Sequence, residues 1–154
     1  MKLSGNAQNF DESNKPSRLP PNGALSDIRP SLESIREKLT YSRRLERLWI
    51  FIEEHYSEPD THLDDAARYC GISRDHLNSL LNQFADITFY DFLIRYRIEK
   101  CLELLHRKNY TLTEIYSRCG FNGPGPFIRQ FKKWVGCLPS DYKKQYVRHL
   151  KGKH

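Results

Sequence analysis

The chain has 154 residues, of which 38% are hydrophobic and 29% are charged, and its formal net charge at pH 7 is +6. This length and composition are enough for one core of ordinary size plus a tail. No apolar run reaches about eighteen residues, and the N-terminus lacks the hydrophobic segment of a secretory signal, so we expect a cytoplasmic protein with no membrane partner.

The positive charge is concentrated at the C-terminal end of the chain. Residues 1–40 carry six Lys/Arg and five Asp/Glu, residues 41–117 carry ten and thirteen, and residues 118–154 carry nine and one. The net charges of the three segments are therefore +1, −3 and +8. A basic run is often only a solvated face, but a segment this poor in acids is typical of a phosphate-binding surface.

The four cysteines lie far apart in sequence, without C-x-x-C spacing, and two of them precede a glycine in the same way. They are Cys70, Cys101, Cys119 and Cys137. We interpret all four as buried core thiols. A metal site would have to gather them with histidines from separate helices, and no local spacing prepares such a site. We therefore expect no metal and no cofactor.

Residues 1–30 contain four prolines among polar residues and have no apolar period, which predicts a disordered tail. A helix start is expected at Pro30-Ser31, and apolar residues then follow at steps of three and four as far as Tyr56. The pattern fits one long helix or two helices broken near residues 40–42. Residues 31–42 are thus predicted to form a helical extension or linker, and the apolar residues 49–52 are expected to pack under the unit that follows.

Within this extension, Leu32, Ile35 and Leu39 form a short apolar stripe. The stripe could pair with the same stripe of a second copy. Because three residues make a weak seam, we expect a monomer rather than a dimer.

The second half of the chain contains one unit twice. Residues 63–72 align with residues 112–121 at an offset of 49, and beyond the turn the offset becomes 50. A short helix ending at Cys-Gly, a tight bend and a second helix with an apolar stripe are typical of a helix-turn-helix, whose second helix reads a DNA major groove. Two copies predict two groove-reading helices on one chain.

In the first unit, a helix over residues 63–70 is expected to precede a recognition helix whose N-terminus is capped by Ser73. The negative charge of Asp75 in the first turn should stabilise this second helix. Thr88 then opens the longest helix, roughly residues 89–107. At about 1.5 Å per residue this helix spans roughly 28 Å. That length is close to the separation of about 34 Å between two major-groove readers on one face of a duplex.

The second unit begins with a capping box in which Thr111 and Glu114 satisfy each other's backbone donors. Residues 122–125 are expected to form its turn, with Pro126 at or near the first position of the second recognition helix. The predicted core face of that helix consists of Phe127, Phe131 and Trp134. A terminal helix is expected to begin at Pro139-Ser140.

From Gly120 to Tyr142 the residues follow the pattern GF, F-x-R-x-F-K-K, G-x-x-P-S-x-Y. This pattern resembles the signature of AraC/XylS-type transcription regulators, and the resemblance covers about residues 43–148. It implies an all-α fold of about seven helices, in which two helix-turn-helix subdomains are joined by a long central helix and enter adjacent major grooves. We place this predicted DNA-binding domain at residues 43–150.

The chain departs from the family pattern at three places. The residues ahead of position 43, with their four prolines, are unsuited to the family's usual β-barrel sensor, so the chain resembles the short, sensor-free members. The second recognition helix holds Pro124, Gly125 and Pro126 where the family carries polar side chains, which leaves Arg129 as its candidate reader. In the first unit, Asp86 stands where a glycine is common.

The candidate DNA-contacting residues lie on the outer faces of the two recognition helices, about residues 74–85 and 126–135, and in the basic segment. An Asn carboxamide can pair with adenine and an Arg fork with guanine in the major groove, whereas phosphate contacts carry no sequence information. The base-reading candidates are Arg74, Asp75, Asn78, Ser79, Asn82 and Arg129. The phosphate-contact candidates are Gln83, Arg118, Gln130, Lys132, Lys133, Lys143 and Lys144.

We expect no enzyme, because the sequence contains no G-x-x-x-x-G-K loop, no H-E-x-x-H and no G-x-S-x-G elbow. The leading hypothesis is a sequence-specific transcription regulator that acts as an activator on promoter DNA without a cofactor. The alternative is an interaction module whose acidic first unit binds RNA polymerase or another regulator. In that case the basic second unit would hold DNA only nonspecifically.

Overall fold

The structure is a computed structural model that describes residues 32–107 and 109–152, and within them the chain is all-helical. A helix over residues 32–39 precedes α3 (Arg43–His55), α4 (Leu63–Cys70), α5 (Arg74–Ala85), α6 (Phe89–Leu105), α7 (Leu112–Arg118), α8 (Pro124–Val135) and α9 (Pro139–Gly152). The predicted all-α fold of about seven helices is confirmed. The predicted tail over residues 1–30 lies outside the described residues.

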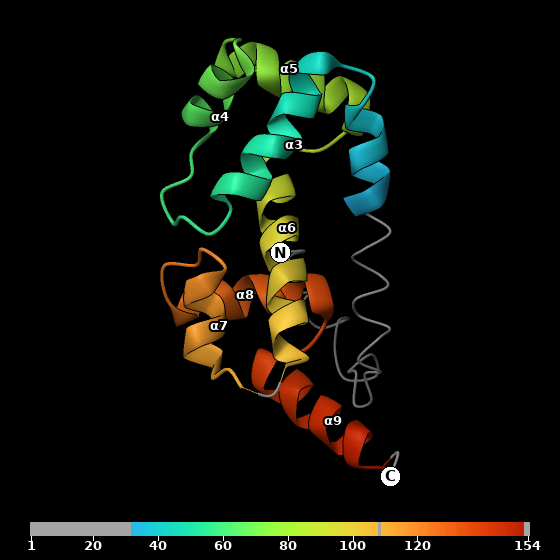
Figure 1. The fold of residues 1–154 in the computed structure, drawn as a ribbon, viewed down its shortest axis with the longest axis vertical. Helices are drawn as coiled ribbons and strands as arrows, with labels where there is room; N and C mark the ends of the chain where they lie inside the picture. Colours follow the sequence, from blue (N-terminus) through green and yellow to red (C-terminus); the bar gives the residue numbers. More distant parts are fainter. Residues whose placement is uncertain (1–31, 108, 153–154) are drawn as a thin grey trace, which may run out of the picture.

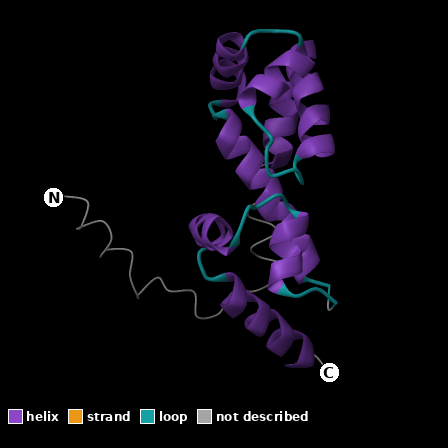
Figure 2. Ribbon diagram, turned by 90° about the vertical axis from the view of Figure 1, so that its left-hand side faces the viewer, coloured by secondary structure: helices purple, strands orange, loops and turns teal. Residues whose placement is uncertain are grey.

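The helices form two groups stacked along the long axis of the molecule. Figure 1 shows α3, α4 and α5 with the helix over residues 32–39 at the upper end, α7, α8 and α9 at the lower end, and α6 running between them. Helices and loops alone make up the described residues in Figure 2. Each group contains one helix-turn-helix, and α6 contacts both groups, through Trp49 of α3 at one end and through α7 and α8 at the other.

The segment before residue 56 is broken at residues 40–42, the second of the two arrangements that its pattern allowed. Ser42 has an extended backbone and caps α3, its hydroxyl accepting the Leu45 N–H at 3.4 Å. In α3 Phe51 and Ile52 are buried and Trp49 is half-buried, as expected. Ile50 is exposed, which corrects the expectation that all four apolar residues pack inward.

The stripe of Leu32, Ile35 and Leu39 is buried in the same core as the helices of the first unit. Arg36 of this short helix also places its guanidinium 5.0 Å from the ring centre of Trp49 in α3. The interpretation of this stripe as a seam for a second copy is therefore wrong. Burial within one chain releases the same apolar surface from water without the entropy cost of association.

The central helix α6 is buried along most of its length. It ends at Leu105, two residues earlier than predicted, and it buries the following residues: Phe89, Phe92, Leu93, Tyr96, Arg97, Ile98, Glu99, Cys101, Leu102 and Leu105. Toward the first unit, Phe92 and Tyr96 pack on Trp49, each with ring centres 5.6 Å apart. Toward the second unit, α6 packs against α7 and α8. A helix buried on opposite faces acts as the core of both units.

The two units meet around Arg97 of α6. Its guanidinium donates to the Tyr56 carbonyl at 2.8 Å and to the Glu58 carbonyl at 2.9 Å, both in the loop between α3 and α4. Burial lowers the pKa of Arg97. The turn after α7 packs on the same atoms, because a Cβ added to Gly120 would overlap the Tyr56 carbonyl oxygen and lie 2.7 Å from Arg97 Nε. Gly120 also has a φ of +91°, which favours glycine.

We predict that Gly120→Ala lowers the free energy of unfolding by about 2–4 kcal/mol, because left-handed strain and overpacking add together. Gly136→Ala is the matched control: its φ is +100°, yet no atom lies within 4 Å of an added Cβ. The control should lose only about 1–2 kcal/mol. Urea unfolding followed by circular dichroism measures both losses. Equal losses would contradict the close contact of Gly120 with Arg97 and the Tyr56 carbonyl, which we call the junction between the units.

Candidate nucleic-acid interface

The first helix-turn-helix consists of α4, a turn at Gly71 and α5. Gly71 ends α4 in the left-handed conformation with a φ of +76°. Ser73 then caps α5 as predicted, its hydroxyl accepting the His76 N–H at 3.1 Å. Leu77 and Leu81 are fully buried and anchor the inner face of α5, so the opposite face is presented to solvent.

All the residues of α5 that were proposed to contact DNA are exposed. They are Arg74, Asp75, Asn78, Ser79, Asn82 and Gln83. Arg74 Nη1 lies 3.5 Å from Asp64 Oδ1 of α4, and both side chains are more than half exposed. Because exposed ion pairs are weak, this pair orients Arg74 without withdrawing it from a competing phosphate or base.

The second helix-turn-helix consists of α7, a turn that begins at Gly120, and α8. Thr111 caps α7, its hydroxyl accepting the Glu114 N–H at 3.1 Å. The Glu114 carboxylate accepts the Thr111 hydroxyl at 3.2 Å, whereas the predicted capping box had it accepting the Thr111 backbone N–H. The side chains of Thr111 and Glu114 therefore cap the N-terminus of α7, with one hydrogen bond that differs from the predicted pair.

The second recognition helix begins at Pro124, two residues before the predicted start at residue 126. Both prolines fit because the N–H groups of the first helical turn have no intrahelical partner. The first backbone bond of α8 is accordingly donated by Phe127 to the Gly123 carbonyl, at 3.5 Å. The predicted range of 126–135 is therefore corrected to 124–135.

The two faces of α8 divide as its sequence pattern predicts. Phe127 and Phe131 are buried and Trp134 is half-buried. The basic candidates Arg129, Lys132 and Lys133 are exposed, and Gln130 is half-buried. Arg129 Nη1 lies 3.5 Å from the position of a Cβ added to Gly125, so this guanidinium reaches back toward the start of α8. In a helix-turn-helix this is the end that meets base edges.

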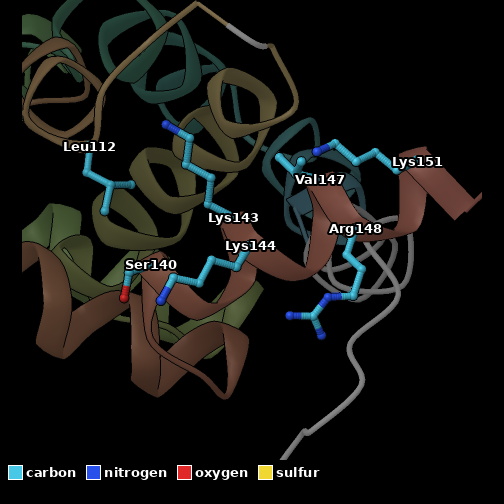
Figure 3. Close-up of a pocket in the computed structure, with 7 residues that line it drawn as sticks. All are labelled: Leu112, Ser140, Lys143, Lys144, Val147, Arg148 and Lys151. Atoms are coloured by element: carbon cyan, nitrogen blue, oxygen red, sulfur yellow. The ribbon is translucent and has the colours of Figure 1, made fainter.

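A groove between the start of α7 and one face of α9 holds much of the remaining positive charge. Its volume is about 580 Å³, and Figure 3 shows the residues that line it: Leu112, Ser140, Lys143, Lys144, Val147, Arg148 and Lys151. Lys144 extends toward Ser140 in this view. The sequence reasoning missed Arg148 and Lys151, although their spacing of four and seven residues from Lys144 places all three near one face of a helix.

Two phosphate-contact candidates are engaged within the protein. Lys143 is half-buried and donates to the Tyr110 carbonyl at 2.8 Å, which ties α9 to the segment before α7. Arg118 is exposed and places its guanidinium 4.8 Å from the ring centre of Tyr110. Lys144, by contrast, is exposed. The number of cationic side chains free to bind an anion in this region is therefore smaller than its formal charge suggests.

Both recognition helices begin on the same side of the molecule. In Figure 1, α5 and α8 each run from left to right, so their N-terminal ends lie on the side of α4 and α7. The N-terminal residues of a recognition helix are those that contact base edges. The two helix starts therefore lie on one side of the molecule, one above the other along its long axis.

The four thiols are free and buried, which confirms their interpretation as core residues. Burial raises the pKa of Cys70 and of Cys137 to about 11, and burial together with the neighbouring Cys119 thiol raises the pKa of Cys101 well above its usual value. Among residues 32–107 and 109–152, no group of three or more His, Cys, Asp or Glu is arranged to hold a metal ion. The helices described here are also too short or too polar to cross a membrane.

Two helix-turn-helix units built on one shared central helix define a double helix-turn-helix domain. Residues 66–145 match a family model described as a helix-turn-helix domain, of the AraC type. The chain belongs to this AraC-type helix-turn-helix family, which is a family of DNA-binding transcription regulators and not a known class of enzymes.

Individual relatives support the same assignment. Among curated proteins, the chain is 30% identical over 113 residues to YdeC of Bacillus subtilis, an uncharacterised HTH-type transcriptional regulator, covering 73% of this chain and 38% of that protein. The chain spans 33–38% of the length of the first three curated relatives it matches.

Solved structures show the same fold. The C-terminal domain of AraT, a response regulator from Geobacillus stearothermophilus, is 30% identical with a TM-score of 0.64, over 67% of this chain and 85% of that chain. The DNA-binding domain of AdpA, a global transcriptional factor solved in complex with a target DNA, is 23% identical with a TM-score of 0.65, over 70% and 96% of the two chains. At that identity the AdpA structure supports the fold alone.

We predict that Lys143→Met and Lys144→Met have different effects. The first should lower the free energy of unfolding by about 1–2 kcal/mol, because it removes a charge-assisted hydrogen bond and leaves the Tyr110 carbonyl unpaired. The second, at an exposed site, should change it by less than about 0.5 kcal/mol. Thermal unfolding of the two variants measures the contrast, and similar stabilities would argue against the tie between α9 and Tyr110.

Proposed function

We propose that this chain is a sequence-specific DNA-binding transcription regulator that places α5 and α8 in adjacent major grooves on one face of promoter DNA. The observation that carries this proposal is that both recognition helices begin on one side of the molecule, held by the buried helix α6. With 17 residues, α6 spans about 26 Å. This length is of the same order as the separation of about 34 Å between two grooves, and in Figure 1 α5 lies beyond the upper end of α6 while α8 crosses its lower half.

The two units are proposed to make different contributions to DNA binding. The first unit reads bases through Arg74, Asn78 and Asn82, whose side chains are exposed on α5. The second unit supplies most of the phosphate affinity through exposed cations on α8 and α9, and Arg129 is its base reader. We propose that the regulator acts as an activator and needs no cofactor.

A second candidate function is an interaction module for RNA polymerase or another regulator. The exposed face of α3 favours it, because Ile50 is 42% exposed between the exposed acids Glu46, Glu53 and Glu54. An exposed apolar residue in a unit of negative net charge, −3 over residues 41–117, suits a basic protein partner better than DNA. Under this alternative, DNA binding would have a single affinity for all sequences.

A selection from a randomised DNA library separates the two functions. The proposal predicts a motif with two half-sites about 10–10.5 base pairs apart, centre to centre. Binding of the selected and the scrambled duplexes is then compared at one salt concentration, because affinity for DNA depends strongly on salt. No enrichment of any motif would leave the interaction module as the function.

We predict that Arg129→Ala weakens binding to the selected site by about 1–3 kcal/mol, because it removes the exposed arginine fork of α8. Fluorescence anisotropy with a labelled duplex measures the loss. Arg68→Ala is a suitable control, since Arg68 is exposed on α4 and pairs with Asp65 at 3.0 Å. Unchanged affinity of Arg129→Ala, with circular dichroism showing an intact fold, would end the assignment.

We further predict that Asn78→Ala relaxes the base preference at one position of the motif, whereas Lys132→Ala weakens binding to all sequences alike and reduces the salt slope by about one unit. The two variants therefore separate base reading from phosphate contact. Binding to a panel of single-base variants of the motif, at several salt concentrations, is the measurement. If Asn78→Ala changes the affinity for every DNA sequence by the same factor, the base reader of the first unit lies elsewhere on α5.

A further inference from the structure

We infer that Arg97 is a positioning residue that fixes the separation and rotation of the two recognition helices and thereby sets the half-site spacing that the protein accepts. The inference rests on the proposed function, and it concerns the spacing of the two half-sites rather than their sequence. Arg97 lies on α6 and is 7% exposed, so it is not itself a DNA contact.

On one side, Arg97 holds the end of the first unit. Its Nε and Nη2 donate to the carbonyls of Tyr56 and Glu58, and Tyr56 is the C-terminal cap of α3. Helix α3 packs in turn against both α4 and α5. These two hydrogen bonds therefore act together with the packing of Trp49 on Phe92 and Tyr96 to set the position of the first recognition helix relative to α6.

On the other side, Arg97 contacts the turn of the second unit. The guanidinium carbon lies 5.9 Å from the ring centre of Phe121, and the Gly120 backbone approaches Arg97 Nε too closely for any side chain at that position. Phe121 packs on Phe127, the first buried side chain of α8, with ring centres 5.5 Å apart. A continuous set of contacts thus runs from the end of α3 through Arg97 to the start of α8.

The loop bound by Arg97 also has an anchor of its own. The Thr61 hydroxyl lies within hydrogen-bond distance of two carbonyls, that of His55 at 2.7 Å and that of Glu58 at 2.8 Å, and Thr61 is buried. The loop is thus tied to α3 without Arg97. Loss of the arginine fork should therefore loosen the attachment between the units while each unit keeps its own fold.

A planar fork is needed for this role. A guanidinium can donate to two carbonyls at fixed angles while its face lies on an aromatic ring, whereas a lysine ammonium is a point charge on a flexible stem. Adding one base pair between two half-sites moves them apart by about 3.4 Å and rotates one relative to the other by about 35°. A rigid junction cannot follow this change, but a loosened one can.

The experiment measures spacing preference in full-length protein. The duplexes carry the selected motif with its own spacing, the motif with one base pair added or removed, and each half-site alone. The variants are Arg97→Met and Arg97→Lys. Lys100→Met is the control, because it removes a positive charge from the same helix at a residue that borders the same loop but pairs with Glu103 at 3.6 Å, and it leaves both hydrogen bonds of Arg97 in place.

We expect the original protein and Lys100→Met to lose roughly tenfold in affinity for each one-base-pair change in spacing, because both helices can no longer engage at once. Arg97→Met should lose less than about threefold for the same change. Its affinity for each single half-site should stay within about twofold of the original, since Arg97 does not contact DNA. Arg97→Lys should lie between the two.

A steep spacing profile retained by Arg97→Met and Arg97→Lys, with the fold intact, overturns the inference. If Arg97→Met does not fold, Gly120→Ala decides instead, because its added Cβ disturbs the same junction from the second unit. Gly120→Ala should flatten or shift the profile and Gly136→Ala should not, and identical profiles for these two variants reject the inference. Failure of the proposed function has a different outcome, namely that the original protein selects no paired half-sites.

Discussion

The burial of α6 between the two helix-turn-helix units is the constraint on which the rest of the structure depends. Phe92 and Tyr96 pack on Trp49 of the first unit, while Arg95 lies over Trp134 of the second at 4.4 Å. Each helix-turn-helix is too small to bury a core by itself. Since both take their missing apolar surface from the same helix, neither unit is expected to fold independently of α6, and their relative orientation follows from how each packs on it.

Short-range features of the fold could be predicted from the sequence because one or two residues determine them. Ser73, Thr88 and Thr111 each cap a helix as predicted, because a cap depends on a hydroxyl and the turn that follows it. The start of α8 could not be settled in this way. Pro124 and Pro126 are both compatible with a first helical turn, and only the folded backbone distinguishes them.

Long-range features could not be predicted, because nothing local marks them. Arg97 and the Tyr56 carbonyl are 41 residues apart in the chain, and in sequence Arg97 is one of several charged residues on a long helix. The sequence shows that the stripe of residues 32–39 is apolar, but it does not show which surface the stripe packs against. The hydrophobic effect is not directional, so any apolar surface could cover it. The candidate site was predictable as a set of exposed side chains on α5 and α8, whereas the tie between Lys143 and Tyr110 depends on where α9 lies.

The start of α8 implies that the proposed phosphate affinity of the second unit would come mainly from side chains. Helix N-termini bind phosphates through free backbone N–H groups, but Pro124 and Pro126 remove two of the four such groups from α8. Gly123 and Gly125 add no side-chain donors there. In the proposed function, binding by this unit would therefore depend on Arg129, which reaches back toward the helix start, and on the exposed lysines that follow it. A helix start with few donors but fixed φ angles would suit a unit that contributes position and charge, while α5 does most of the proposed base reading.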